Sequence, residues 1–284
     1  MTPPIATFDI RRPSGATGPF VFASPHSGDL RPADMRPATS LTDASIASAE
    51  DIGVDRLLES APGAGVPVIS ARISRAYVDL NRAPGDHDPL LIADAPPGAG
   101  QGASAAKIAA GYGVIPRRTG DGADLYDRRL TLAEARARLE TVHTPYHAAL
   151  ATLMQQAHAH HGAVVLIDWH SMPSHAVSGD RRVRGPDVVL GDRHGTACDA
   201  RLTRRLRTLF EAAGWTVALN RPYAGGYTTQ TWGRPDEGFH AIQIELSRAL
   251  YLDEATRSPS AGHGRCVGVI ERVTRAMRDD GWPA

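Results

Sequence analysis

Cysteine is scarce in this chain: Cys198 and Cys266 are the only two among 284 residues, and they lie far apart in no paired motif. This argues against a thiolate metal site and favours a reducing compartment. An excess of either charge is also missing, because 31 basic residues balance 31 acidic ones. Nucleic-acid surfaces depend on clustered basic side chains, so the composition gives no reason to expect a nucleic-acid partner.

Long apolar runs are absent as well, and none approaches the ~20 residues that a membrane-spanning helix needs. The opening residues Met1-Thr2-Pro3-Pro4 lack the basic stretch and apolar core of a signal peptide. Neither a G-x-G-x-x-G pattern nor a P-loop follows the first apolar run, which argues against a nucleotide binder. We therefore expect a cytoplasmic protein with no membrane partner.

The most informative stretch is an apolar run, 163–167, that ends in Asp168, Trp169 and His170. A short β-branched run of this kind is typical of a central strand buried on both faces. In open α/β sheets, functional groups gather beyond the carboxyl ends of such strands. A metal ligand and its supporting carboxylate are therefore expected at His170 and Asp168. The alternative is a histidine that merely ends a strand, which is the commoner case for a lone His.

Apolar runs alternate with helical periodicity along the rest of the chain, which predicts an α/β fold. Strands are predicted at 20–23, 66–70, 76–80, 163–167, 187–191, 215–219 and 239–246. Helices are predicted at about 42–61, 131–162, 196–213 and 263–278. The Thr131-x-x-Glu134 pattern has capping-box form, and Pro145 predicts a kink or two helices meeting near Thr144.

These elements indicate a single domain, 1–284, with a three-layer α/β/α architecture and a mixed, mainly parallel sheet. The stretch 83–124 is rich in Gly, Pro, Ala and Asp and has weak periodicity. Loops of this length inside a compact domain are usually functional. We expect it to border the site.

Three predicted strand ends carry polar groups: His26 follows the first strand, His170 the central one, and Glu245 lies near the end of the last. Two histidines and one carboxylate form the ligand set of a catalytic zinc site, which keeps a fourth position open for water. The carboxylate stays open among three acids near His26, namely Asp29, Glu50 and Asp51. Glu245 is a candidate general base, with a structural ion pair to Arg248 as the alternative.

Donors for an anionic substrate or an oxyanion lie near the predicted strand 76–80, at Arg75, Asn81 and Arg82. Arginine binds carboxylates through a planar fork, although surface arginines are the usual alternative. Tyr223 and Tyr227 flank a glycine-rich loop and are candidates to close over a substrate; a plain turn explains Gly225-Gly226 equally well.

Eight segments occur in order between residues 24 and 251: "SPHSG", "EDIGVDRL", "SRAYVDLNR", "TPYHAAL", "VLIDWHSMPS", "DVVLGD", "NRPYAGGY" and "HAIQIELSRALY". Each is weak alone, but together they resemble the N-formylglutamate amidohydrolase family. This family is similar in fold to the zinc-dependent exopeptidases. The resemblance implies hydrolysis of N-formyl-L-glutamate to L-glutamate and formate, within histidine degradation. Alternatives are hydrolysis of another N-acyl amino acid or small peptide, and a non-catalytic metal-binding relative.

The resemblance also implies a role for each candidate residue. It makes His26 and His170 ligands of one Zn²⁺ per chain, and Glu245 the acid/base carboxylate. It gives Arg75 an oxyanion or substrate role. For the carboxylate ligand, the wider fold's His-x-x-Glu pattern would select Asp29. The "ED" before "VDRL" looks more regular in the family and favours Asp51.

The substrate contacts follow from the same resemblance. The "DLNR" segment, which is similar to its counterpart in aspartoacylase, implies that Asn81 and Arg82 bind the substrate carboxylate. The expected partner is thus a small anionic N-acyl amino acid.

Overall fold

The computed structural model describes residues 6–176 and 185–281. The chain falls into two compact units. Unit 1 comprises Met1–Asp9, Pro25–Asp51 and Ser70–Leu150; unit 2 comprises Ile10–Ser24, Ile52–Ile69 and Ala151–Ala284. The single domain expected from the sequence stays a prediction.

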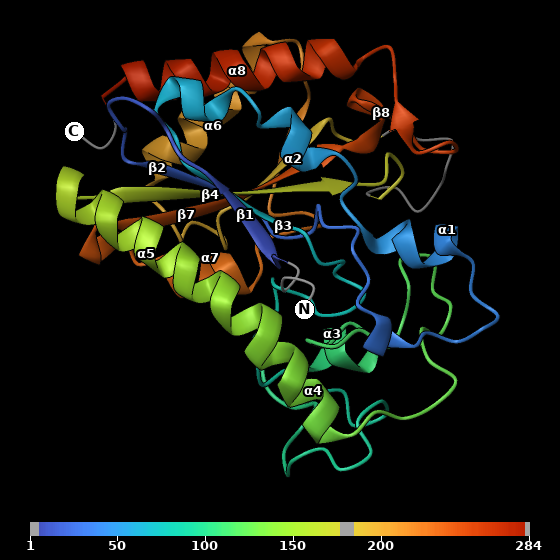
Figure 1. Cartoon of the computed structure of the whole chain (residues 1–284). Helices are drawn as coiled ribbons and strands as arrows, with labels where there is room; N and C mark the ends of the chain where they lie inside the picture. The colour runs from blue at the N-terminus through green and yellow to red at the C-terminus, as the bar shows by residue number, and fades with distance from the viewer. Residues whose placement is uncertain (1–5, 177–184, 282–284) are drawn as a thin grey trace. The chain divides into compact units, whose positions relative to one another are not determined.

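The central feature is a seven-stranded sheet with the strand order β1-β3-β2-β4-β7-β5-β6 (Figure 1). Its β2–β4, β4–β7 and β5–β6 pairs are parallel, and β5–β7 is antiparallel. The predicted α/β class with a mixed, mainly parallel sheet is confirmed. In chain order the strands are β1 (Phe8–Arg11), β2 (Phe20–Ser24), β3 (Val68–Ala71), β4 (Val164–Met172), β5 (Val188–Gly191), β6 (Val217–Leu219) and β7 (Phe239–Ser247). A separate hairpin joins β8 (Leu252–Asp253) to β9 (Ser258–Pro259).

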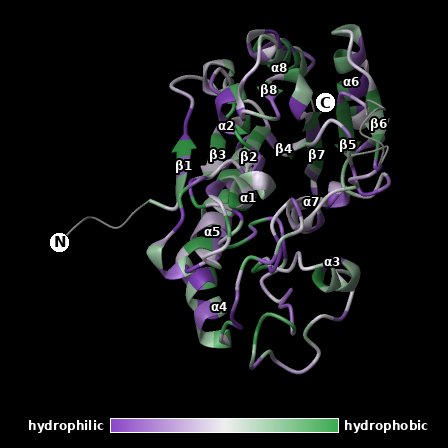
Figure 2. Ribbon diagram, turned by 90° about the vertical axis from the view of Figure 1, so that its right-hand side faces the viewer, coloured by the Kyte–Doolittle hydropathy of each residue, from purple (hydrophilic) through white to green (hydrophobic). Residues whose placement is uncertain are grey.

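Helices cover the sheet on both sides: α2 (Val54–Leu57), α6 (Ala200–Ala212) and α8 (His263–Asp279) lie on one, and α5 (Thr144–His161) and α7 (Tyr227–Trp232) on the other (Figure 1). Hydrophobic residues concentrate in the strands (Figure 2). In β4, Val165, Ile167 and Trp169 join the core beneath α2, α6 and α8. Because side chains alternate along a strand, Asp168 and His170 point to the opposite face.

Unit 1 consists mostly of turns and short helices, among them α1 (Asp43–Ile46), α3 (Ala105–Ala109) and α4 (Leu132–Arg138). The predicted capping box at Thr131 and Glu134 is confirmed by both of its reciprocal hydrogen bonds. A π-helical turn (Leu139–His143) joins α4 to α5, so two helical segments meet at Thr144 as Pro145 predicted. Short 3₁₀ turns occupy Ala33–Met35, Ala47–Ala49, Ala61–Ala64, Pro235–Glu237 and Arg248–Leu250.

The helix predicted at 42–61 is wrong as one element. It breaks into α1, two 3₁₀ turns and α2. Glu50 has extended backbone and Gly53 has φ 75°, a left-handed conformation that no α-helix interior accommodates. The break leaves Asp51 between the helical pieces.

The strand predicted at 76–80 is also wrong, because these residues form turns. The Tyr77 N–H donates to the Ser74 carbonyl, and the Asn81 N–H donates to the Asp79 carboxylate. Its apolar residues are buried as the pattern suggested, but in a segment whose hydrogen bonds are local or made to distant groups. β1 was not predicted. In the described residues, no helix is long and apolar enough to cross a membrane.

Candidate active site

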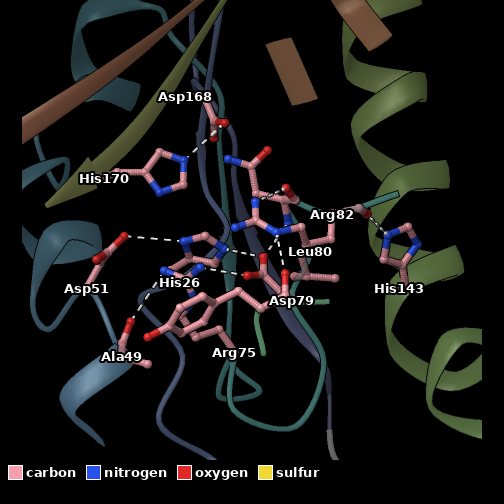
Figure 3. A network of polar contacts seen from close by, with 12 residues as sticks. His26, Ala49, Asp51, Arg75, Asp79, Leu80, Arg82, His143, Asp168 and His170 are labelled. Atoms are coloured by element: carbon pink, nitrogen blue, oxygen red, sulfur yellow. Dashed lines mark hydrogen bonds and ion pairs between the residues drawn. The ribbon is translucent and has the colours of Figure 1, made fainter. Parts of the chain in front are cut away.

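His26 is the centre of a buried polar network in unit 1 (Figure 3). It follows the end of β2, and its Nε2 lies 2.7 Å from Asp79 Oδ1. Its Nδ1 lies 3.4 Å from Asp51 Oδ2. The Asp51 N–H also donates to the His26 carbonyl at 2.9 Å, which ties the break between α1 and α2 to the end of the strand. Both nitrogens of the His26 ring thus face carboxylates.

Asp79 organises this network from a position that is only 2 % exposed. It accepts hydrogen bonds from Arg75 Nη2 at 2.6 Å and from the Asn81 N–H at 2.9 Å, besides facing His26. Burial alone would raise the pKa of Asp79, but the charges of Arg75, His26 and Arg82 outweigh it and hold the pKa well below its usual value. Asp79 is therefore ionised at neutral pH and favours the tautomer in which His26 carries a proton on Nε2.

Unit 2 places a second histidine beside an acid. In the parallel register of β4 and β7, His170 is the partner of Glu245 and Asp168 is the partner of Gln243. All four side chains point to one face and are buried. His170 Nε2 lies 3.1 Å from Asp168 Oδ2 (Figure 3). Gln243 Nε2 donates to Glu245 Oε1 at 2.6 Å.

The predicted donors of unit 1 lie around Asp79. Arg75, whose side chain is 20 % exposed, pairs with Asp79. Asn81 is buried. Arg82 donates from Nε to the Tyr112 carbonyl at 2.9 Å and from Nη1 to the Asn81 carbonyl at 3.0 Å. Two backbone carbonyls thus hold the Arg82 guanidinium through its Nε and Nη1.

The tyrosine loop belongs to unit 2 and packs against the end of β5. Arg193 N–H donates to the Ala224 carbonyl at 2.8 Å. A Cβ added to Gly191 would lie 2.8 Å from the Ala224 carbonyl carbon, so this approach requires glycine. Tyr223 is 36 % exposed, and Tyr227 begins α7.

Three of the predicted ligands, His26, Asp51 and His170, are a candidate metal-binding triad: each is buried and each offers one ligand atom. Asp29, the alternative carboxylate, is exposed.

Two supporting residues escaped the sequence reasoning. Asp79 lies in the "VDLNR" segment, which was interpreted as a strand, so its link to His26 was not foreseen. Gln243 precedes Glu245 by two residues, and the strand period of two was a usable signal that both share a face.

A mixed α/β sheet with carboxylate-bound histidines and a buried glutamate beside one of them has the features of a hydrolase with a candidate metal site. The family model for N-formylglutamate amidohydrolase matches residues 18–252. The chain belongs to the N-formylglutamate amidohydrolase family.

Individual relatives agree with this membership. The chain is 34 % identical over 268 residues to the N-formylglutamate deformylase of Pseudomonas aeruginosa, covering 91 % of each chain. It is 30 % identical over 240 residues to the N-formylglutamate deformylase of Pseudomonas putida, covering 83 % of this chain and 82 % of the other. Its fold matches the crystal structure of N-formylglutamate amidohydrolase from Ralstonia eutropha JMP134 with a TM-score of 0.90 at 34 % identity, over 97 % and 98 % of the two chains.

Proposed function

We propose that this protein hydrolyses the formyl amide of N-formyl-L-glutamate, with water as the second substrate and L-glutamate and formate as products. The observation that carries the proposal is the β4–β7 register, which sets a candidate metal ligand, His170, directly beside a buried carboxylate, Glu245. The names of the curated relatives supply the substrate. We further propose a cytoplasmic enzyme of histidine degradation, in keeping with its two unpaired cysteines.

We propose one Zn²⁺ per chain, held by His26, Asp51 and His170. The donor set of two imidazoles and a carboxylate suits zinc. In both histidines Nε2 faces an aspartate, Asp79 or Asp168, and we assign Nδ1 to the metal. Carboxylates in this outer position orient ligating imidazoles and raise their basicity.

Asp51 is the better carboxylate ligand. It is buried and its Oδ2 faces His26 Nδ1, whereas Asp29 is exposed to solvent. When bound, zinc supplies a Lewis acid that polarises a carbonyl and acidifies water.

Glu245 is the general acid and base in this proposal. Its carboxylate accepts a proton from the water whose oxygen attacks the formyl carbon. It then delivers that proton to the amine nitrogen as the carbon–nitrogen bond breaks. Gln243 donates to Oε1 and fixes that oxygen of Glu245. Burial of both side chains keeps bulk water from competing for the carboxylate.

The substrate's charged groups are assigned to donors of unit 1. Arg75 is oriented by Asp79 and stabilises negative charge on the carbonyl oxygen. Asn81 and Arg82 bind the substrate carboxylate, with the Arg82 fork oriented by the two backbone carbonyls that it contacts. Tyr223 and Tyr227 are proposed to close over the bound substrate.

The test is formate release from N-formyl-L-glutamate, compared with N-acetyl-L-glutamate and N-formyl-L-leucine. We expect turnover of the first substrate, loss of activity after treatment with a chelator, and recovery on adding one equivalent of zinc. A purified, folded, zinc-loaded protein that releases no formate from N-formyl-L-glutamate would contradict the proposed function.

A further inference from the structure

Two histidines of the helical stretch that ends in α5 hold the backbone on both sides of Asn81. His147 Nε2 lies 2.9 Å from the Leu80 carbonyl oxygen. His143 Nε2 lies 3.0 Å from the Arg82 carbonyl oxygen (Figure 3). The carbonyls before and after Asn81 are therefore both bonded to side chains of one helix, and all five residues lie within unit 1.

The direction of these hydrogen bonds is set by chemistry, because a carbonyl oxygen only accepts. Each ring must carry a proton on Nε2 and donate it. Burial lowers the pKa of His143, and burial together with the neighbouring His143 lowers the pKa of His147 to about 3. Their ring centroids are 4.3 Å apart, so two positive charges there would repel. Both rings are thus neutral donors at neutral pH.

A third side chain of the same stretch anchors the start of the segment. Arg138 is fully buried and donates from Nη1 to the Tyr77 carbonyl at 3.2 Å and to the Tyr126 hydroxyl at 2.7 Å. Its guanidinium carbon also lies 4.3 Å from the centroid of the Tyr77 ring. Side chains of the helical stretch therefore bond to the backbone at both ends of the segment that was predicted as the strand 76–80.

The π-helical turn helps to place Arg138, His143 and His147 on one side of the helical stretch. The Thr144 N–H donates to the Leu139 carbonyl, five residues earlier, so the turn holds one residue more than an α-helical turn. In an α-helix, residues five apart do not share a face, but a widened turn brings Arg138 and His143 closer to one side. His147 follows His143 by four residues in α5 and lies on the same face.

Residues 77–82, all of which the structure describes, form neither a strand nor an α-helix. The Asn81 N–H donates to Asp79 Oδ1, and Arg82 donates to the Tyr112 and Asn81 carbonyls. The Arg82 N–H also donates to the Asp79 carbonyl at 3.3 Å, and the Asp79 N–H to the Val114 carbonyl at 2.8 Å. These bonds use N–H groups and side-chain donors, whereas the carbonyls of Leu80 and Arg82 are bonded by the histidines. Displacing either carbonyl would rotate the peptide planes that aim the Asn81 and Arg82 side chains.

We propose that His143 and His147 are positioning residues that set the selectivity of the enzyme for a free substrate carboxylate, acting through the backbone on both sides of Asn81. The inference rests on the proposed function, in which Asn81 and Arg82 bind that carboxylate. It assigns a role to the "TPYHAAL" segment, which the reaction itself does not use.

The test compares two substitutions at each histidine. His143→Leu and His147→Leu remove the donor and keep a buried apolar side chain. His143→Gln and His147→Gln keep an N–H donor that reaches about as far as Nε2. His160→Leu is the matched control, because His160 is exposed near the end of the same helix. Each variant is assayed with N-formyl-L-glutamate and with its carboxamide analogues, and its zinc content and thermal melting are measured.

Each leucine variant should raise KM for N-formyl-L-glutamate by roughly 2- to 12-fold, the worth of one neutral hydrogen bond. The preference for the free acid over the carboxamide should fall by a similar factor, while kcat and zinc content change little. The glutamine variants should recover most of the preference, and the control should match the parent. Leucine variants with the parent's KM and preference would overturn the proposal. So would equal losses in the leucine and glutamine variants.

Hydrogen exchange separates this inference from the proposed function. In the leucine variants, amide exchange should accelerate in peptides that cover 77–82, while peptides from α5 stay protected. This measurement needs no substrate, so it remains decisive if the parent fails to deformylate N-formyl-L-glutamate. Unchanged exchange at 77–82 in folded leucine variants would overturn the positioning role, whatever the substrate. If a leucine variant does not fold, amide exchange at 77–82 is measured in the matching glutamine variant. Exchange as slow as in the parent supports the donor role of the histidine. Faster exchange at 77–82 in a glutamine variant that folds like the parent contradicts that role.

Discussion

Asp79→Asn is the most informative single change, because Asp79 is predicted to support both His26 and Arg75. The amide keeps the shape of the side chain but removes its charge. The bonds at stake are those to His26 Nε2 at 2.7 Å and Arg75 Nη2 at 2.6 Å. Loss of a carboxylate behind a metal-binding histidine costs about 10- to 100-fold in metal affinity. We therefore expect Asp79→Asn to lose its zinc to a competing chelator at a chelator concentration about 10- to 100-fold lower than the parent requires.

The same substitution should also lower stability. Removing one partner of a buried ion pair costs about 3–5 kcal/mol, and the lower end applies because the Arg75 side chain is 20 % exposed. Chemical denaturation of the metal-free proteins measures this difference without the contribution of zinc binding.

The pH dependence of that difference follows from the lowered pKa of Asp79. Its folded-state pKa lies well below the reference value of 3.8, so the unfolded chain takes up the proton first as the pH falls. The stabilisation by Asp79 is thus complete above the unfolded pKa and is lost as the pH falls through the folded pKa. The gap in unfolding free energy between parent and Asp79→Asn should be constant near neutral pH and shrink below about pH 4.

Asp88→Asn is the matched control. Asp88 is buried and pairs with Arg117 at 2.8 Å, but among the described residues it has no ion pair with a histidine. The Asp88→Asn variant should be less stable than the parent but should bind zinc with the parent's affinity. If Asp79→Asn bound zinc as tightly as Asp88→Asn does, the supporting role of Asp79 would be refuted.

Four further outcomes test the proposed site. Asp51→Ala should weaken zinc retention in elemental analysis and Asp29→Ala should not; the reverse would exchange their roles. Arg82→Lys should raise KM for N-formyl-L-glutamate despite the retained charge, because lysine lacks the planar fork; an unchanged KM would contradict the binding of the substrate carboxylate by Arg82. Glu245→Gln should keep zinc and fold while kcat falls by roughly 100- to 10,000-fold; an early-melting but active variant would make Glu245 structural. Gly191→Ala should lower the melting temperature, since its Cβ would lie 2.8 Å from the Ala224 carbonyl carbon; an unchanged melt would contradict that close packing.

Much of the fold could be predicted because its signals are local. The apolar runs of β4 and β7 are buried along nearly their whole length, so composition alone marks them as central strands. The capping box at Thr131 needs only residues three apart. The joint at Thr144 follows from the geometry of proline in a helix. His170 and Glu245 were proposed as site residues in the same way, because a polar residue at the end of an apolar strand stands out.

The errors arose where local pattern and tertiary contact disagree. The segment 76–80 alternates like a strand, yet its Tyr77 and Leu80 carbonyls bond to the side chains of Arg138 and His147 instead of a neighbouring strand. The predicted helix 42–61 has the apolar period, yet Gly53 takes a left-handed conformation that ends it. Periodicity reports which residues are buried, and it does not report what buries them.

The sequence by itself determined the α/β class, the principal strands, the candidate ligands and the candidate base, since each depends on neighbours in the chain. The tertiary structure decided which groups support them. Asp79 reaches His26 across 53 residues, and His143 reaches the Arg82 carbonyl across 61. It also favours Asp51 over Asp29 by burying one and exposing the other. Contacts of this kind have no local signal, because their free energy comes from burial and charge pairing between segments that only folding brings together.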